Sequence, residues 1–144
     1  MEYDFVLIKD NVFYDVTEDE IIASENEMNL SFPRELKVFW SKIGYGFLSS
    51  KKGNINRIMD PVSVRDFRAK EGDFEYIPDV DIYEIYEKDK LIFFEANESA
   101  YISIGIGPDN NGKIYYYDVE IAENLSDFLL KLISDDNYYV DMKL

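Results

Sequence analysis

The sequence predicts an α+β fold in which a central, mostly antiparallel sheet is flanked by helices. Helical patterns with capping signals occupy the first half of the chain and recur near its end, whereas alternating apolar residues and a strong turn signal lie between them. The 144 residues suffice for one ordinary domain, and the chain contains no repeat, low-complexity tract or linker. We therefore expect a single domain that spans residues 1–144.

The first elements combine a strand pair with a capped helix. Two short apolar runs, 5–8 and 12–14, flank a polar turn and predict a short hairpin or a strand with a bend. Thr17 and Glu20 have the spacing of a capping box, in which each side chain accepts the backbone amide of the other residue. A helix that extends to about Met28 is expected to follow.

Proline and glycine mark the next helices. Pro33 suits a first helical turn and Gly44 a C-terminal stop, while Asp60 and Pro61 predict the start of a third helix. The apolar face of the second helix has helical spacing and consists of Leu36, Phe39, Trp40 and Ile43. A less regular fourth helix is expected to carry Ile82, Ile85 and Tyr86.

The second half of the chain predicts the sheet and a closing helix. Residues 91–95 and 101–106 have strand patterns, and alternation places Ile102, Ile104 and Ile106 on one face. The turn signal at 108–112 leads into a further strand at 114–118. A final helix is expected from about Leu125, and its inward stripe consists of Phe128, Leu129, Leu132 and Ile133.

The composition removes several classes of function. The chain has no cysteine, which excludes disulfides and thiolate metal sites, and no histidine, which excludes the commonest general base and metal ligand. Carboxylate chemistry stays open, although no spacing specifies it, and we expect no cofactor. No apolar run approaches the roughly 18 residues of a membrane span, and the first residues lack the basic start of a signal peptide. We therefore expect a cytoplasmic protein.

The net charge of −15 disfavours direct binding of nucleic acids. Acidic residues are concentrated in 1–33, 71–98 and 118–136, whereas 34–70 is basic, so the surface is expected to be polarised. Two explanations remain open. The acidity can serve solubility, or it can complement a basic partner through electrostatic steering.

Three motifs have both a chemical and a structural interpretation. Gly44-Tyr45-Gly46 resembles a fragment of a phosphate loop, but it follows a helix instead of preceding one, which favours a helix cap and turn. Residues 109–112 have some features of a calcium loop, but the strand pattern after them favours a hairpin turn. Three carboxylates could bind a hard cation or form a solvated face: Asp79, Asp81 and Glu84.

Tyrosines interleave with acids in the block 71–98, a combination that suits contact with a basic protein. Aromatic anchors supply apolar area, and the carboxylates supply charge complementarity. Packing in the core is the alternative role of these aromatics. The predicted partner-binding residues are Asp73, Glu75, Tyr76, Asp79, Asp81, Tyr83 and Glu84.

The order of the segments carries a resemblance to a known family. The segments concerned are 21–25, 30–40, 43–46, 56–61, 91–95, the hairpin through Gly112, and 124–129. In this order they resemble the SUKH superfamily over about residues 12–134. Many members have Asn-Gly-Gly where this chain has Gly44-Tyr45-Gly46, so the subfamily is left open.

The resemblance implies an α+β domain without catalytic activity. Many bacterial members are immunity proteins that neutralise a toxin, often a nuclease, and yeast members regulate cell-wall assembly. We therefore expect a cytoplasmic immunity protein, a monomer or weak dimer, whose partner is a basic cognate toxin and not a nucleic acid or a membrane. A regulatory scaffold in cell-envelope or signalling assemblies is the alternative, and a carboxylate-dependent hydrolase or metal-binding protein is a third hypothesis.

Overall fold

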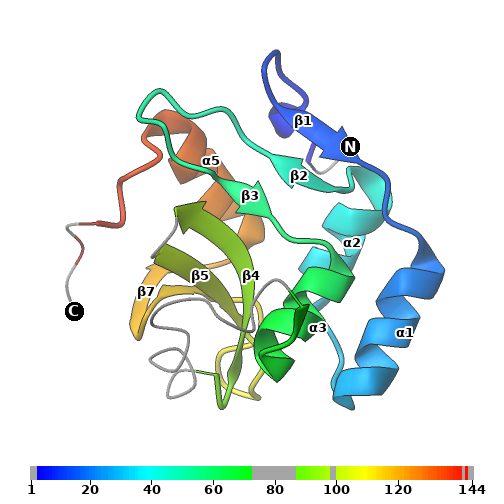
Figure 1. Ribbon diagram of the computed structural model, residues 1–144. Helices are drawn as coiled ribbons and strands as arrows, with labels where there is room; N and C mark the ends of the chain where they lie inside the picture. The colour runs from blue at the N-terminus through cyan, green and yellow to red at the C-terminus, as the bar shows by residue number, and fades with distance from the viewer. Residues whose placement is uncertain (1–2, 73–86, 98–99, 141, 143–144) are drawn as a thin grey trace.

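The computed structural model describes residues 3–72, 87–97, 100–140 and 142, and in them it contains four α-helices and seven β-strands (Figure 1). The strands form one antiparallel sheet in the order β1-β2-β3-β4-β5-β6-β7. The predicted α+β class and antiparallel sheet are confirmed. The strands are β1 (Val12–Tyr14), β2 (Tyr45–Phe47), β3 (Arg57–Ile58), β4 (Lys90–Asn97), β5 (Ala100–Gly105), β6 (Ile114–Tyr116) and β7 (Val119–Ala122). The helices are α1 (Glu18–Met28), α2 (Arg34–Lys42), α3 (Pro61–Ala69) and α5 (Leu125–Ser134), preceded by the short 3-10 helix η1 (Asp4–Val6).

The helix boundaries follow the capping signals. The Thr17 side chain accepts the Glu20 amide and the Glu20 carboxylate accepts the Thr17 amide, each at 3.2 Å, which confirms the capping box. Pro33 is the N-cap of α2, and Pro61 is the first residue of α3. The side chain of Asn124 caps α5 by accepting an amide hydrogen bond of 2.8 Å.

The expected hairpin, or strand with a bend, at the start of the chain is wrong for residues 5–8, whereas Val12–Tyr14 is extended as predicted. The chain forms η1 where a first strand was expected, and β1 pairs with β2, so that Val12 lies opposite Phe47. Packing of the N-terminal segment explains why residues 5–8 do not form a strand: the buried ring of Tyr3 meets Phe39 of α2 edge-on at 5.2 Å. This contact holds the N-terminal segment over α2 instead of beside β1. Strands β2, β3 and β7 were not expected.

Helices lie on both faces of the sheet. Phe94 on β4 packs edge-on against Phe128 of α5 at 5.2 Å, and Phe13 on β1 packs against Phe39 of α2 at 6.1 Å. Strand register puts these residues on one face, so α2 and α5 cover the same side (Figure 1). On the other side, Phe67 of α3 contacts Tyr101 of β5 at 4.8 Å, and α1 packs beside α3.

Trp40 anchors α2 to the segment that follows β3. Its side chain is 1% exposed, and its ring packs edge-on against Phe32 at 4.7 Å. The indole Nε1 donates a 2.8 Å hydrogen bond to the carbonyl oxygen of Met59. The buried indole therefore keeps its one polar group satisfied while it contributes a large apolar surface.

Gly44 and Gly46 have positive φ, so a Cβ atom on either one would point at the backbone of β1. A Cβ atom at Gly44, where φ is +116°, would lie 2.0 Å from the carbonyl oxygen of Tyr14. A Cβ atom at Gly46, where φ is +153°, would lie 2.0 Å from the carbonyl oxygen of Val12. Gly44-Tyr45-Gly46 therefore ends α2 and begins β2, and its glycines admit the neighbouring strand.

We predict that Gly46→Ala lowers the free energy of unfolding by about 3 kcal/mol or more, because a backbone clash adds to an unfavourable φ. The matched control is Gly53→Ala. Gly53 also has positive φ, +77°, but a methyl group on its Cα atom would meet no other atom within 4 Å. The control is expected to lose only about 1 kcal/mol. Urea unfolding measures both values, and equal losses would contradict the close approach of β1.

Candidate partner-binding surface

The seven predicted contact residues, Asp73, Glu75, Tyr76, Asp79, Asp81, Tyr83 and Glu84, lie outside the described residues. The expected fourth helix and the possible hard-cation group at 79–84 lie there too. Their role therefore stays a prediction. The surface described below is formed by other residues.

One row of side chains crosses the sheet on the side that carries α3. Register aligns Val12, Phe47, Arg57, Glu95 and Tyr101 across β1 to β5. The apolar end of this row is open, because Val12 is 46% exposed and Phe47 is 39% exposed, whereas Tyr101 at the other end is 1% exposed. Helix α3 therefore covers the centre of the sheet and leaves its β1–β2 end accessible.

Two tyrosines extend the open end of this row. Tyr14 lies opposite Tyr45 in the register, and their rings are 5.3 Å apart. Tyr14 is 50% exposed, and Tyr45 is partly exposed. We call this group the edge patch: Val12, Tyr14, Tyr45 and Phe47.

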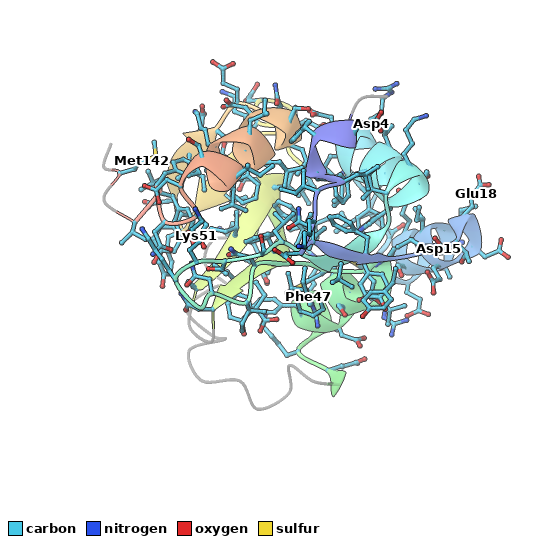
Figure 2. All side chains as sticks on the ribbon, turned by 90° about the horizontal axis from the view of Figure 1, so that it is seen from above. Asp4, Asp15, Glu18, Phe47, Lys51 and Met142 are labelled. Atoms are coloured by element: carbon cyan, nitrogen blue, oxygen red, sulfur yellow. The ribbon has the colours of Figure 1, made fainter. Side chains whose placement is uncertain are left out.

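Acidic side chains follow the edge patch directly. Asp15 is the residue after β1, and the first turn of α1 carries Glu18, Asp19 and Glu20, all exposed. In the view of Figure 2, Asp15 and Glu18 lie on one side of Phe47, and Lys51 lies on the opposite side. The edge patch therefore has an acidic end, where the side chains extend into solvent.

A cleft of about 460 Å³ lies between the segment before β1, the β2–β3 connection and the end of α5, and none of the four edge-patch residues lines it. Its apolar wall includes Ile8 and Ile133, and its polar wall includes Lys51, Asn56 and Asp136. Ile133 was expected to face the core, but it is 43% exposed at this cleft.

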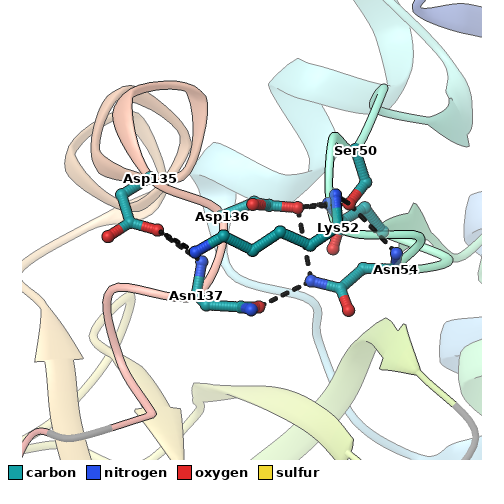
Figure 3. Close-up of polar contacts among 7 residues, drawn as sticks. Ser50, Lys52, Asn54, Asp135, Asp136 and Asn137 are labelled. Atoms are coloured by element: carbon teal, nitrogen blue, oxygen red, sulfur yellow. Dashed lines mark hydrogen bonds and ion pairs between the residues drawn. The ribbon is translucent and has the colours of Figure 1, made fainter.

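A carboxylate clamp joins the chain after α5 to the β2–β3 connection (Figure 3). The Oδ2 atom of Asp136 accepts hydrogen bonds from the Ser50 hydroxyl, from Asn54 Nδ2 at 3.2 Å and from Asn56 Nδ2 at 3.1 Å. Asn54 Nδ2 also donates to Asn137 Oδ1 at 2.6 Å. These bonds hold the chain after α5 against the β2–β3 connection, so the role of the clamp is to stabilise the fold.

The covered part of the row holds an ion pair and a buried phenol. Arg57 Nε lies 3.9 Å from Glu95 Oε1, and both side chains are largely covered. Burial raises the pKa of Glu95, while the charge of Arg57 opposes that change. Burial and the nearby Glu95 carboxylate raise the pKa of Tyr101 to about 12, so its phenol is neutral at physiological pH.

The remaining motifs have structural roles in the described part of the chain. Residues 109–112 form a hairpin turn, in which Asn110 Oδ1 accepts the Gly107 amide at 2.8 Å and Asn110 Nδ2 bonds Asp89. The described residues contain no group of three or more acids placed to hold a metal ion. They also include no helix with the length and hydrophobicity to cross a bilayer.

Sequence reasoning did not identify the edge patch. The signal was present as two short alternations, Val12 with Tyr14 and Tyr45 with Phe47, but each was too short to show a sheet face. The acids at 15–20 belong to the acidic block 1–33, and the sequence does not show which aromatic side chains lie beside them. Pairing between β1 and β2 joins these signals on one surface.

Comparison with known proteins shows the family of this chain. The model of the SMI1/KNR4 family (SUKH-1) matches residues 15–131, which is most of the chain. The chain belongs to this family. The protein named "Immunity protein YxxD" from Bacillus subtilis (strain 168) is 48% identical over 143 residues, which cover 99% of this chain and 97% of that protein. The family match confirms the resemblance to the SUKH superfamily. No solved structure matches this chain.

We predict that Asp136→Ala lowers the free energy of unfolding by about 2–3 kcal/mol, because three donors lose their shared acceptor. Asp135→Ala is the neighbouring control. Asp135 is exposed, and its ion pair with Lys52 is 3.4 Å long, so the control should lose far less. Thermal unfolding compares the two, and similar losses would show that the clamp is unimportant for stability.

Proposed function

We propose that this chain is a non-catalytic immunity protein that binds and neutralises a cognate toxin, whose toxic domain is a basic nuclease. The observation that carries the proposal is the similarity to the protein named "Immunity protein YxxD", which extends over 99% of the chain at 48% identity. Such coverage leaves no large segment of the chain unmatched. The expected cytoplasmic location and monomeric or weakly dimeric state belong to this proposal.

The charge supports a basic partner. A net charge of −15 attracts a positively charged protein over several ångströms and repels nucleic acid. A nuclease needs a basic cleft to bind phosphates, so an acidic surface can occupy that cleft or screen it. In this mechanism the inhibitor makes no chemical change and acts by covering the active site of the toxin.

Two regions can supply the contact surface. One is the acidic and aromatic segment 73–84 predicted from sequence. The other is the edge patch with the acids Asp15, Glu18, Asp19 and Glu20. Both combine aromatic rings with carboxylates, which suits a partner that presents basic side chains around apolar pockets.

A rescue experiment tests the function. The open reading frame immediately upstream is expressed in a heterologous bacterium with and without this chain. We expect toxicity that co-expression relieves, and a complex that is stable on gel filtration. A toxic neighbour that this chain neither binds nor neutralises would overturn the pairing, and several weak partners in its place would favour the regulatory scaffold.

Charge reversal tests the predicted segment. We expect Asp79→Lys, Asp81→Lys and Glu84→Lys together to slow association with the toxin at least about tenfold at low salt, because steering is lost. The control reverses three exposed acids elsewhere, Asp109, Asp118 and Glu123, and so gives the same net charge. Stopped-flow binding measures both rates, and equal rates would remove this segment from the contact surface.

A further inference from the structure

We infer that the β1 edge of the sheet binds an extended, basic segment of the toxin, which pairs with β1 as an additional strand and packs on the edge patch. The inference rests on the proposed immunity function and adds the place and mode of contact. It differs from a general acidic surface because it requires backbone pairing at one strand.

The first support is the free edge of the sheet. In the strand order of the described residues, β1 is terminal and pairs only with β2. Consecutive residues of an antiparallel strand direct their amide and carbonyl groups to alternate sides. Either Phe13, or Val12 together with Tyr14, therefore directs hydrogen-bonding groups away from β2. Such groups are a template for another strand.

The second support is the composition of this edge. Natural sheets protect edges with proline, inward-facing charges or bulges, and β1 consists of valine, phenylalanine and tyrosine with a regular register to β2. Among the described residues, the protective feature that β1 does show is its shortness, because it has three residues. A partner strand is thus held by few backbone bonds, and side-chain contacts must contribute the rest.

The edge patch can supply those contacts. Val12, Tyr14 and Phe47 are 46%, 50% and 39% exposed and lie on one face of the β1–β2 pair. The opposite face of the same pair is closed, since Phe13 packs on Phe39 at 6.1 Å. An added strand would therefore direct alternate side chains over the edge patch, where apolar residues and the stems of lysine or arginine can pack.

Charge identifies the occupant. Asp15 follows β1, and Glu18, Asp19 and Glu20 lie in the first turn of α1; all four are exposed. Two copies paired through β1 in parallel would bring Asp15 next to its own equivalent, and every pairing of two copies joins chains of net charge −15. Like charges oppose such a dimer, whereas a segment with lysine or arginine beside its paired residues is attracted to Asp15 and to the acids of α1.

The close packing of β1 on β2 prepares this edge. Gly46 of β2, and Gly44 just before β2, lie where a Cβ atom would clash with the backbone of β1. The edge strand is therefore held in place before a partner arrives, which limits the ordering cost of binding.

The test uses the toxic domain encoded by the upstream open reading frame and two lysine variants of this chain. Tyr14→Lys places a cation in the edge patch. Leu130→Lys is the matched control, because Leu130 is 54% exposed on α5, which covers the opposite side of the sheet from the edge patch. We expect Tyr14→Lys to weaken binding at least tenfold in calorimetry and Leu130→Lys to change it less than twofold. Thermal unfolding checks that both variants fold.

A second measurement needs no variant. Amide hydrogen exchange of the wild-type chain, followed by NMR, should show that the outward amides among residues 12–14 become protected only in the complex. Unchanged exchange there, with unchanged affinity of Tyr14→Lys, would overturn the inference while wild-type rescue leaves the immunity function standing. Failure of the wild-type chain to bind would instead overturn the function and the inference together. A toxin-free dimer that Tyr14→Lys disrupts would assign the edge to a second copy and also overturn the inference.

Discussion

Phe94 packs edge-on against Phe128 on one face of the sheet, and Tyr101 packs against Phe67 on the other. Both contacts involve the β4–β5 hairpin, whose β5 strand is buried along its whole length. Helices α5 and α3 are positioned by these rings. Strands β3 and β6 pair with the two sides of the hairpin, and β1 and β2 are added beyond β3. The accessible edge of the sheet thus depends on a core at some distance from it.

Much of this arrangement could be predicted from sequence because local signals carry it. The capping box at Thr17, the prolines at the starts of α2 and α3, and the alternation in β5 each act within a few residues. Two- and three-residue strands have no such periodicity. Strand β3 contains only Arg57 and Ile58, and its identity as a strand comes from the neighbours that flank it.

The hairpin error has a similar origin. Alternation shows that Val12–Tyr14 is extended, but it does not select a partner strand. Burial of Tyr3 against Phe39 removes the nearer candidate, and the glycines at 44 and 46 make the more distant segment the better neighbour. The edge patch arises only from this pairing across some thirty residues, which explains why sequence reasoning placed the contact surface in the acidic segment alone.

The chain contains a single tryptophan, and its environment has a practical consequence. The indole of Trp40 is enclosed between α2 and the segment after β3, with its Nε1 bonded to the Met59 carbonyl oxygen. Its fluorescence therefore reports on whether the core is folded. A protein bound at the edge patch leaves the indole in the same environment. A single spectroscopic label, native to the molecule, can separate loss of folding from loss of recognition.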